Sequence, residues 1–278
     1  MILSGQARRA GVLGWPVAHS RSPRLHGFWL RRHGIDGAYL PLPVRPERFA
    51  DAVRALADLG FAGANVTIPH KEAAFALCDD VAPSARRAGA VNTLVFRDGR
   101  IAGSNTDGWG WLESLWQAVP GFDAAAGPAV ILGAGGAARA VAATLLDAGC
   151  PRLTLVNRTP GRAEALARQL GGPVQVTEAA PLADATLLVN TTSLGMAGQP
   201  PLLLDLSALP AGAVVSDLVY VPLETPLLAA ARARGLTGVD GLGMLLHQAR
   251  PGFAAWFGVE PEVDAALRDF VAQDVPLR

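Results

Sequence analysis

One short segment constrains the fold more than any other. The apolar run Ala129–Leu132 is followed directly by the glycine-rich stretch 133–138 and then by an alanine- and leucine-rich run that stops at Gly149. This is strand, tight turn and helix in the pattern G-x-G-x-x-G/A, with Ala138 in the third small position. Such a turn lets the main chain approach a pyrophosphate, and the helix start offers it unpaired N–H groups. The segment predicts a dinucleotide site at Gly133, Ala134, Gly135, Gly136 and Ala137; the alternative is a tight connection without a ligand.

The rest of the chain alternates β-rich runs with helical runs, which predicts an α/β protein with largely parallel strands. A length of 278 residues, half of them hydrophobic, suits two domains with a large core. We expect a first unit over residues 1–106 and a second that begins near Asp107. The predicted strands are 10–15, 38–44, 63–68, 90–96, 128–132, 152–158, 185–192 and 213–220, and the predicted helices are 22–33, 47–59, one begun by Pro69, one near Trp109, 136–149, 162–170, 226–234 and a final segment 242–271 interrupted at Pro251-Gly252.

Charge and apolar patterning exclude several classes of protein. Lys and Arg together number 24, as do Asp and Glu, so the basic excess typical of a nucleic-acid binder is missing. No apolar run reaches the roughly 18 residues of a membrane span, and the N-terminal residues lack a signal-peptide pattern. Cys78 and Cys150 have neither metal nor redox spacing, and no histidine has ligand spacing. We expect a cytoplasmic globular protein that binds no metal, nucleic acid or membrane.

The residues at the end of the strand that follows the glycine turn indicate whether the cofactor is NAD or NADP. In NAD sites this strand usually ends with an acidic residue, which accepts a hydrogen bond from the ribose 2′-hydroxyl. Here the place is taken by Asn157, Arg158 and Thr159, with Arg162 nearby. Guanidinium groups bind a 2′-phosphate through paired hydrogen bonds, so the sequence favours NADP. The alternative is that both arginines are exposed charges at a helix start.

Lys71 is the only lysine in a chain that has 24 basic residues. An ammonium can give up a proton, whereas a guanidinium effectively cannot. Lys71 falls in the first turn of the helix begun by Pro69, which is the unfavourable end of the helix dipole for a cation. We therefore expect Lys71 to pair with a carboxylate or an anionic ligand. Asp107 is the candidate carboxylate, and it lies at the join of the two units, where we expect a cleft. The alternatives are a solvated surface lysine and an N-cap aspartate for the next helix.

Other polar residues lie at the ends of elements, where α/β sheets bind their ligands. Ser20 and Ser22 follow the first strand, and Ser22 is equally well interpreted as an N-cap before Pro23. Asn65 and Thr67 alternate on a strand and so share one face. Asn92 lies near a strand start, where a turn-forming role is the alternative.

These residues belong to longer motifs, and together the motifs resemble the shikimate dehydrogenase family over nearly the whole chain. The matching segments are 14–23 (GWPVAHSRSP), 65–71 (NVTIPHK), 90–93 (AVNT), 105–108 (NTDG), 133–138, 157–159 with Arg162, 190–195 (NTTSLG), 217–220 (DLVY) and 241–248 (GLGMLLHQ). The family usually has Asn-Ala-Thr where this chain has Asn190, Thr191 and Thr192.

The resemblance implies reversible, NADPH-dependent reduction of 3-dehydroshikimate to shikimate, a step of aromatic amino-acid biosynthesis. It implies a substrate-binding domain at 1–106 and 241–278, formed with helices that return from the C-terminus, and a Rossmann-type NADP domain at 107–240. By the resemblance, Lys71 and Asp107 are catalytic, and the substrate contacts Ser20, Ser22, Asn65, Thr67, Lys71, Asn92, Asp107 and Gln248, with Tyr220 at its border. Thr191, Thr192, Ser193, Leu218, Gly241 and Met244 would line the nicotinamide side.

Two competing interpretations stay open. One is a catabolic quinate/shikimate dehydrogenase, which differs by a single hydroxyl group on the substrate. The other is a sensor that binds nucleotide and ligand on the same fold without catalysis, against which the presence of both Lys71 and Asp107 argues. The expected assembly is a monomer or a homodimer.

Overall fold

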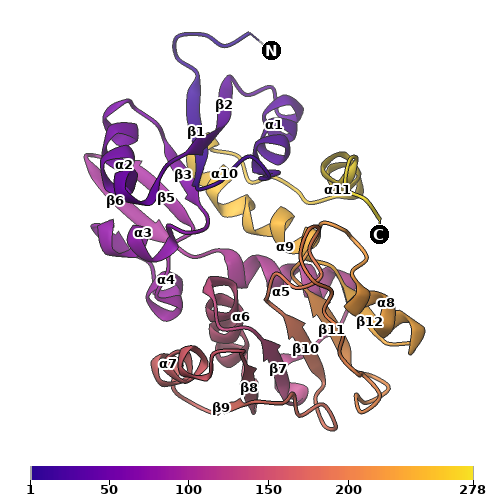
Figure 1. Cartoon of the computed structure of the whole chain (residues 1–278). Helices are drawn as coiled ribbons and strands as arrows, with labels where there is room; N and C mark the ends of the chain where they lie inside the picture. The colour runs from indigo at the N-terminus through magenta and orange to yellow at the C-terminus, as the bar shows by residue number, and fades with distance from the viewer. Residues whose placement is uncertain (1, 278) are drawn as a thin grey trace. The chain divides into compact units, whose positions relative to one another are not determined.

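The computed structural model describes residues 2–277, which form two compact units. The first contains the chain up to Asp107 together with Leu246–Gln273, and the second contains Gly108–Leu245 with the chain from Asp274 onward. Each unit is an α/β structure built on its own sheet (Figure 1). Helix α9 is shared: its first part belongs to the second unit and its end, from Leu246, to the first, whereas the sequence places the return to the first domain at Gly241.

The sheet of the first unit has the strand order β2-β1-β3-β5-β6-β4. Strands β1, β2 and β3 are parallel, as are β4 and β6, but β5 runs antiparallel to both of its neighbours. The elements are β1 (Arg8–Gly14), α1 (Ser22–Arg32), β2 (Gly37–Pro43), the 3-10 helix η1 (Pro46–Arg48), α2 (Phe49–Asp58), β3 (Gly63–Val66), α3 (Lys71–Leu77), β4 (Asp80–Val81), α4 (Pro83–Ala88), β5 (Thr93–Arg97), β6 (Arg100–Ser104), α10 (Arg250–Phe257) and α11 (Ala265–Ala272).

Successive side chains along β1 and β3 point to opposite faces of this sheet, and helices cover both faces. Leu13, Ala64 and Val66 point to the face covered by α2 and α3, where Phe49 and Val53 complete a buried cluster. The opposite face is covered by α1 and α10 (Figure 1). The first unit is therefore a sheet between two helical layers.

Segments from the end of the chain complete the first unit. The indole Nε1 of Trp256 in α10 donates a hydrogen bond to the Leu94 carbonyl oxygen at 2.9 Å. Trp29 of α1 donates in the same way to the Glu262 carbonyl oxygen at 3.0 Å. Because both indoles are buried and pair with backbone oxygens, these contacts fix the returning segment on the sheet.

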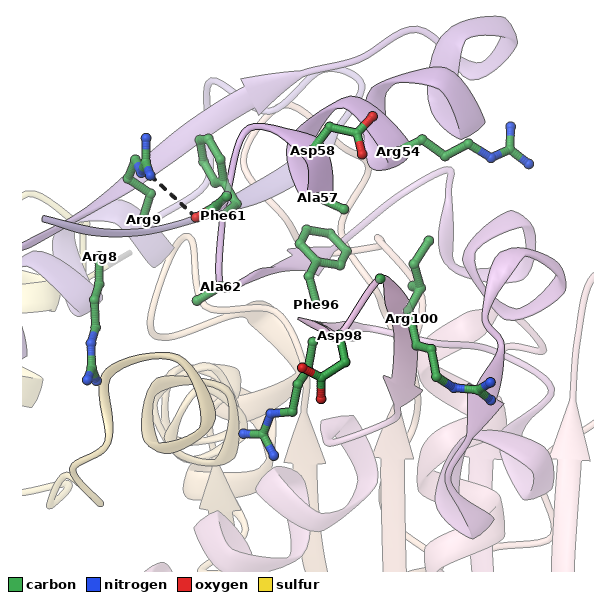
Figure 2. Close-up of a pocket in the computed structure, with 14 residues that line it drawn as sticks. Arg8, Arg9, Arg54, Ala57, Asp58, Phe61, Ala62, Phe96, Asp98 and Arg100 are labelled. Carbon is green, nitrogen blue, oxygen red and sulfur yellow. Dashed lines mark hydrogen bonds between the residues drawn. The ribbon is translucent and has the colours of Figure 1, made fainter. Parts of the chain in front are cut away.

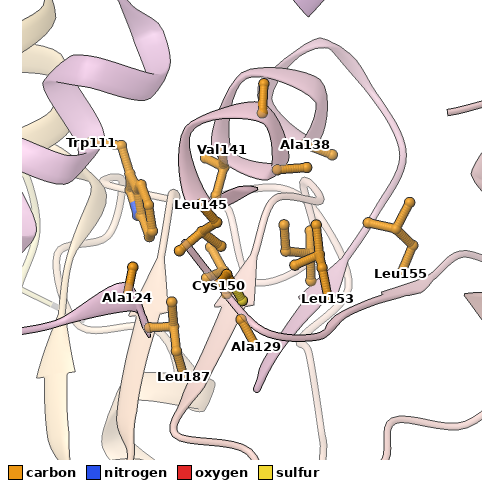
Figure 3. Packing of buried hydrophobic residues seen from close by; sticks show 14 of the residues in the cluster. Trp111, Ala124, Ala129, Ala138, Val141, Leu145, Cys150, Leu153, Leu155 and Leu187 are labelled. Atoms are coloured by element: carbon orange, nitrogen blue, oxygen red, sulfur yellow. The ribbon is translucent and has the colours of Figure 1, made fainter. Parts of the chain in front are cut away.

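The second unit has six parallel strands in the order β12-β11-β10-β7-β8-β9 within the described residues. Its elements are α5 (Asp107–Ala118), the 3-10 helix η2 (Ala124–Ala126), β7 (Ala129–Leu132), α6 (Gly136–Asp147), β8 (Leu153–Val156), α7 (Pro160–Leu170), β9 (Val174–Thr177), β10 (Leu187–Asn190), β11 (Val214–Asp217), α8 (Pro226–Ala233), β12 (Thr237–Val239) and α9 (Gly241–Gln248). Figure 3 shows the larger of its two buried clusters, in which Trp111 and Val141 pack near strand residues such as Leu153. The strand order reverses between β7 and β10, in the middle of the sheet, which is the ligand position of such folds.

Several elements differ from the sequence-based expectation. The helix predicted over 47–59 is a 3-10 turn followed by α2, and α3 begins at Lys71 and not at Pro69. The predicted C-terminal helix is three helices, of which α10 includes Pro251 in its first turn, where a missing N–H costs nothing. Strands β4, β6, β9 and β12 and helix α4 have no counterpart among the predicted elements.

The first unit contains a buried histidine. The His26 ring is stacked on Tyr39 at 3.8 Å and contacts the rings of Trp29, Phe253 and Trp256. Neither ring nitrogen has a hydrogen-bond partner within residues 2–277. Burial lowers the pKa of His26 from 6.5 to about 3, and the neighbouring Asn65 side chain acts in the opposite direction.

This histidine makes the stability of the protein depend on pH. Unfolding restores its ordinary pKa of 6.5, so below that pH the unfolded chain binds a proton that the folded chain does not. The free energy of unfolding should therefore fall as pH drops from 6.5 toward 3, with a contribution of about 1.4 kcal/mol per pH unit. Urea denaturation at about pH 5 to 7 checks this, with His26→Phe as the comparison. The phenylalanine variant should show a flatter dependence, and an equal slope in both proteins would contradict the assignment.

Candidate active site

The topology of the first sheet brings four chain segments to one edge. Strands β1 and β3 are parallel, so both end there, at Gly14 and Val66. Strand β5 is antiparallel and starts at this edge, where Thr93 pairs with Asn65 and with Ser104, the last residue of β6. The loops that follow these strand ends, and the one that precedes β5, therefore lie together. They carry most of the polar residues that the sequence singles out.

Lys71 and Asp107 form an ion pair at this edge. The Lys71 Nζ atom donates to Asp107 Oδ2 at 2.5 Å, and the two side chains are 19% and 7% exposed. Each is the first residue of its helix, α3 or α5. The carboxylate is therefore engaged with the lysine. A positive charge placed at a helix N-terminus is compensated here by its carboxylate partner.

Asn92 joins the ion pair to the rest of the edge. Its Nδ2 atom donates to Asp107 Oδ1 at 2.8 Å and to Thr106 Oγ1 at 3.0 Å, and it lies 3.4 Å from Gln248 Oε1. Its Oδ1 atom accepts from the Thr106 backbone N–H at 2.9 Å. Thr106 in turn donates to the Gln248 backbone oxygen at 2.8 Å. Asn92 is 2% exposed, so its amide orientation is fixed by its partners.

Asn65 is buried and already paired inside the protein. Its Nδ2 atom donates to the Asn92 backbone oxygen and to Thr93 Oγ1, each at 3.2 Å. Its Oδ1 atom accepts from the Tyr39 hydroxyl at 2.6 Å. Both amide hydrogens are therefore used inside the protein. The structure gives Asn65 a role in holding Asn92 and Thr93 at the site.

The three hydroxyl residues lie along the same edge. Ser20 is half-buried in the loop after β1, and its Oγ atom accepts from the Ser22 backbone N–H at 3.3 Å. Ser22 is buried and is the first residue of α1, whose N-cap position is Arg21 without a side-chain cap. The side chain of Ser22 therefore does not cap the helix. Thr67 is half-buried just after β3 and packs against Gly14, where an added Cβ would lie 2.6 Å from its methyl group.

A hollow of about 550 Å³ lies at the other edge of this sheet. It is bounded by the start of β1, the residues before β3 and the β5–β6 turn, with Arg8, Arg54, Arg97 and Arg100 around Phe96. The seven residues of β1 separate it from the Lys71 edge by about 20 Å. Figure 2 shows Arg8 and Arg54 extending in different directions, away from Phe96. The hollow lacks the convergent polar groups of a ligand site.

In the second unit, the glycine turn has the geometry of a pyrophosphate site. Gly133 follows β7 with φ +111°, which favours glycine, and an added Cβ there would lie 2.5 Å from Thr191 Oγ1. Gly135 is the N-cap of α6 and has open space where a side chain would stand. The start of α6, at Gly136 and Ala137, therefore presents backbone N–H groups without a covering side chain, as a dinucleotide pyrophosphate requires.

The residues after β8 fit a 2′-phosphate. Asn157 Nδ2 donates to the Thr159 backbone oxygen at 2.8 Å, which shapes the turn, and Thr159 is the N-cap of α7. Arg158 and Arg162 are exposed, and neither forms an ion pair within residues 2–277. No acidic residue occupies the end of β8. The chemistry of this group fits NADP, while exposed helix-start charges remain the other interpretation of the two arginines.

The residues assigned to the nicotinamide side lie in loops that follow β10 and β11 and at the start of α9. Thr191 donates through Oγ1 to the Leu132 backbone oxygen at 2.7 Å. Leu218 and Met244 are half-buried against the main cluster of this unit, and Gly241 packs so closely on Leu218 that a Cβ would lie 2.0 Å from its carbonyl oxygen. The remaining members, Thr192 and Ser193, lie in the loop after β10, and Tyr220, assigned to the border of the substrate, lies in the loop after β11.

Sequence reasoning missed several residues that shape these sites. Tyr39 orients Asn65, Thr106 links Asn92 to Gln248, and the buried carboxylate of Asp217 joins two loops of the second unit. Thr106 and Asp217 both lie inside motifs that the family resemblance covers, which was an available signal. Burial raises the pKa of Asp217, while hydrogen bonds from Thr225, the Val219 N–H and Asn190 act in the opposite direction. Tyr39 had no sequence signal beyond its place on a strand.

Within residues 2–277, no group of three or more His, Cys, Asp or Glu side chains is arranged to hold a metal ion. None of the helices in that range has the length and apolar character needed to cross a membrane.

Three family models match the chain. Residues 12–94 match the shikimate dehydrogenase substrate-binding domain, residues 118–194 match shikimate/quinate 5-dehydrogenase, and residues 241–268 match the shikimate 5′-dehydrogenase C-terminal domain. The first match lies within the first unit, and the third overlaps the returning segment Leu246–Gln273 but begins earlier, at Gly241.

Individual proteins give the same result. A shikimate dehydrogenase (NADP(+)) from Acidiphilium cryptum is 68% identical over 278 residues, which cover 99% of each chain. A crystal structure of shikimate 5-dehydrogenase from Thermus thermophilus in complex with NADP(H) and shikimate is 40% identical, with a TM-score of 0.84 over 96% of this chain and 99% of that one. A quinate dehydrogenase from Corynebacterium glutamicum in complex with NAD is 31% identical, with a TM-score of 0.88 over 96% and 99%.

Proposed function

Because this chain belongs to the shikimate dehydrogenase family, we propose that it catalyses the reversible, NADPH-dependent reduction of 3-dehydroshikimate to shikimate, with Lys71 and Asp107 as its catalytic residues. The observation that carries the assignment of these two residues is the Lys71–Asp107 ion pair, which lies among Asn92, Thr106 and Gln248 at one edge of the sheet. An ammonium held there can stabilise the negative charge that develops on a carbonyl oxygen.

The Lys71–Asp107 pair has two tasks in the proposed reaction. Lys71 stabilises the charge that develops on the substrate oxygen and gives that oxygen a proton, and in the reverse direction it takes the proton back. Asp107 holds the ammonium in place, and Asn92 holds Asp107 through its second carboxylate oxygen. When bound, NADPH supplies the hydride for the carbonyl carbon.

The remaining polar residues of the edge match the substrate. Shikimate carries a carboxylate and several hydroxyl groups on one ring. Hydroxyl donors suit a carboxylate, and we assign it to Ser20 and Ser22. Thr67 and Gln248 can pair with ring hydroxyls, and we assign Asn65 to the same part of the substrate. Tyr220, in the second unit, is assigned to the border of the substrate.

We assign shikimate and NADP, and not quinate and NAD, as the substrate and cofactor on two grounds. Curated relatives that are 54–68% identical are named shikimate dehydrogenase (NADP(+)), whereas the quinate dehydrogenase is 31% identical. The end of β8 carries Arg158 where an NAD site has an acidic residue.

A panel of shikimate and quinate, each with NADP and NAD, tests this assignment by the absorbance of the reduced cofactor. The highest kcat/KM is expected for shikimate with NADP, and a higher value for quinate or no turnover at all would contradict the proposal.

The cellular setting is part of the same proposal. Cys78 and Cys150 are free thiols, one half-buried and one buried, which suits a reducing compartment. We place the enzyme in the cytoplasm, as a monomer or a homodimer. Sedimentation equilibrium of the purified protein distinguishes the two assemblies.

A further inference from the structure

The carboxylate of Asp217 is buried where two loops of the second unit meet. Asp217 is the last residue of β11 and has no exposed surface. Its Oδ1 atom accepts from Asn190 Nδ2 at 2.8 Å and from the Val219 backbone N–H at 3.1 Å. Its Oδ2 atom accepts from the Thr225 hydroxyl at 2.7 Å. We call Asn190, Asp217, Val219 and Thr225 the Asp217 network.

Through Asn190 the network fixes the loop after β10. Asn190 Oδ1 accepts from the Thr192 backbone N–H at 3.0 Å and from its hydroxyl at 2.7 Å. The Nδ2 atom that donates to Asp217 also donates to the Leu194 backbone oxygen at 3.2 Å. An amide whose nitrogen faces a carboxylate cannot turn over, so Asp217 determines which side of Asn190 meets Thr192.

Through Val219 the network fixes the loop after β11. The Val219 N–H is held by Asp217, and the Val219 carbonyl oxygen accepts from the Gly241 N–H at 3.1 Å. The preceding residue, Leu218, donates its N–H to the Asn190 backbone oxygen at 2.9 Å. The two loops are thus tied to each other and to the start of α9. These are the three segments that carry the residues assigned to the nicotinamide ring.

Stability alone does not account for a carboxylate at this position. Burying a charge is costly even when it is fully hydrogen-bonded, and well-packed apolar residues often serve as well. The neighbouring strand positions Val214 and Val215 are apolar and buried. Thr225 caps α8 through its own oxygen, which accepts from the Leu228 N–H at 3.3 Å, and does not need Asp217 for that bond. What the Asp217 Oδ1 acceptor provides, through Asn190 and the Val219 N–H, is a fixed geometry for both loops at once.

We propose that Asp217 is a positioning residue for hydride transfer, which sets the placement of the nicotinamide ring by holding the loops after β10 and β11 in register. This inference rests on the proposed function. It assigns no contact between Asp217 and the cofactor, because its oxygens are used by Asn190, Val219 and Thr225. It predicts that loss of Asp217 affects the hydride step more than the binding of NADP, whose phosphates are assigned to the α6 start and to Arg158.

The test uses Asp217→Ala in the full chain. We expect kcat for 3-dehydroshikimate reduction to fall by about 10- to 100-fold, the usual effect of a small misplacement of reacting groups. The Kd of NADP should stay within about threefold, since the phosphate contacts lie elsewhere. With NADPH deuterated at the transferred C4 position, the isotope effect on kcat should exceed that of the wild type, because a misplaced ring makes hydride transfer slower than the physical steps.

Three further variants separate positioning from folding. Asp217→Asn keeps the shape and an acceptor for Asn190 and Val219, so it should restore kcat to within about threefold of the wild type. Thr225→Val removes the donor to Asp217 and the α8 cap. It should raise the isotope effect to a lesser degree than Asp217→Ala, and it carries the test if Asp217→Ala does not fold. Thr186→Val is the matched control: it loses a 3.2 Å hydrogen bond to the Pro128 oxygen at the opposite edge of the same sheet. This control should lower stability without changing the isotope effect.

The inference is overturned if folded Asp217→Ala keeps the wild-type kcat and isotope effect, or if it loses NADP affinity in proportion to kcat. It is also overturned if Asp217→Asn is as impaired as Asp217→Ala, or if Thr225→Val and Thr186→Val show the same isotope effect. A failure of the proposed function looks different, because the wild-type protein itself would then not reduce 3-dehydroshikimate.

Discussion

Replacing Lys71 with alanine should lower kcat by about 10²- to 10⁴-fold, the range expected when a positioned proton donor is lost. The KM for the substrate should change much less, because the residues assigned to the carboxylate and ring hydroxyls remain. The effect follows from the structure, in which Lys71 Nζ lies 2.5 Å from Asp107 Oδ2 and is held at the edge of the sheet. Steady-state kinetics in both directions at saturating NADP or NADPH measure it.

Two comparisons sharpen this prediction. Lys71→Arg keeps the positive charge but cannot release a proton, so the activity it retains measures the electrostatic share of the effect. Arg48→Ala removes an exposed cation of the same unit, which is 3.5 Å from Asp51, and should leave kcat unchanged. If Lys71→Ala keeps the wild-type kcat, the residue has no part in the chemistry.

Replacing Arg158 with alanine should raise the KM for NADP by about 10- to 100-fold, because a charge-assisted pair with the 2′-phosphate is worth about 1.5–3 kcal/mol. The KM for NAD should change by less than about threefold, since NAD has no phosphate at this position. The preference for NADP should therefore shrink by about the same factor. Initial rates of shikimate oxidation with each cofactor give both constants.

The control for Arg158 lies in the helix that follows it. Arg168 is exposed near the end of α7 and is 4.0 Å from Glu164, so Arg168→Ala removes an equal charge at a distance from the β8 end. It should leave the preference for NADP unchanged. The double variant Arg158→Ala with Arg162→Ala should lose more of the preference than either single variant. Equal losses of NADP and NAD affinity in Arg158→Ala would mean that it does not contact the 2′-phosphate.

The second unit was the easier of the two to predict from the sequence. Its glycine turn, its apolar strands and its glycine-terminated helices follow local rules, and α7 indeed stops before Gly171. The first unit depends on pairings that local patterns do not encode. The antiparallel run of β5 and the two-residue strand β4 follow from long-range pairing, and the periodicity of such short runs does not reveal their direction.

The candidate site could be predicted as a set of residues but not as an arrangement. The single lysine and the helix it begins pointed to a carboxylate partner, and the structure places Asp107 there. No pattern along the chain indicates that Asn65 has both amide hydrogens paired inside the protein, because that depends on Asn92 and Thr93 arriving from another part of the sheet. Buried networks of this kind are fixed by tertiary geometry, which no spacing in the sequence describes.

The first unit is assembled from two stretches of chain that are separated by Gly108–Leu245, the larger part of the second unit. Residues up to Asp107 need Leu246–Gln273 to cover the sheet, and Thr106 finds its acceptor on Gln248. A fragment that ends at Asp107 would therefore lack α10 on one face of its sheet and Gln248 beside Thr106. During synthesis, residues Gly108–Leu245 leave the ribosome before the segment Leu246–Gln273, so most of the second unit is made before the first unit can complete its sheet packing.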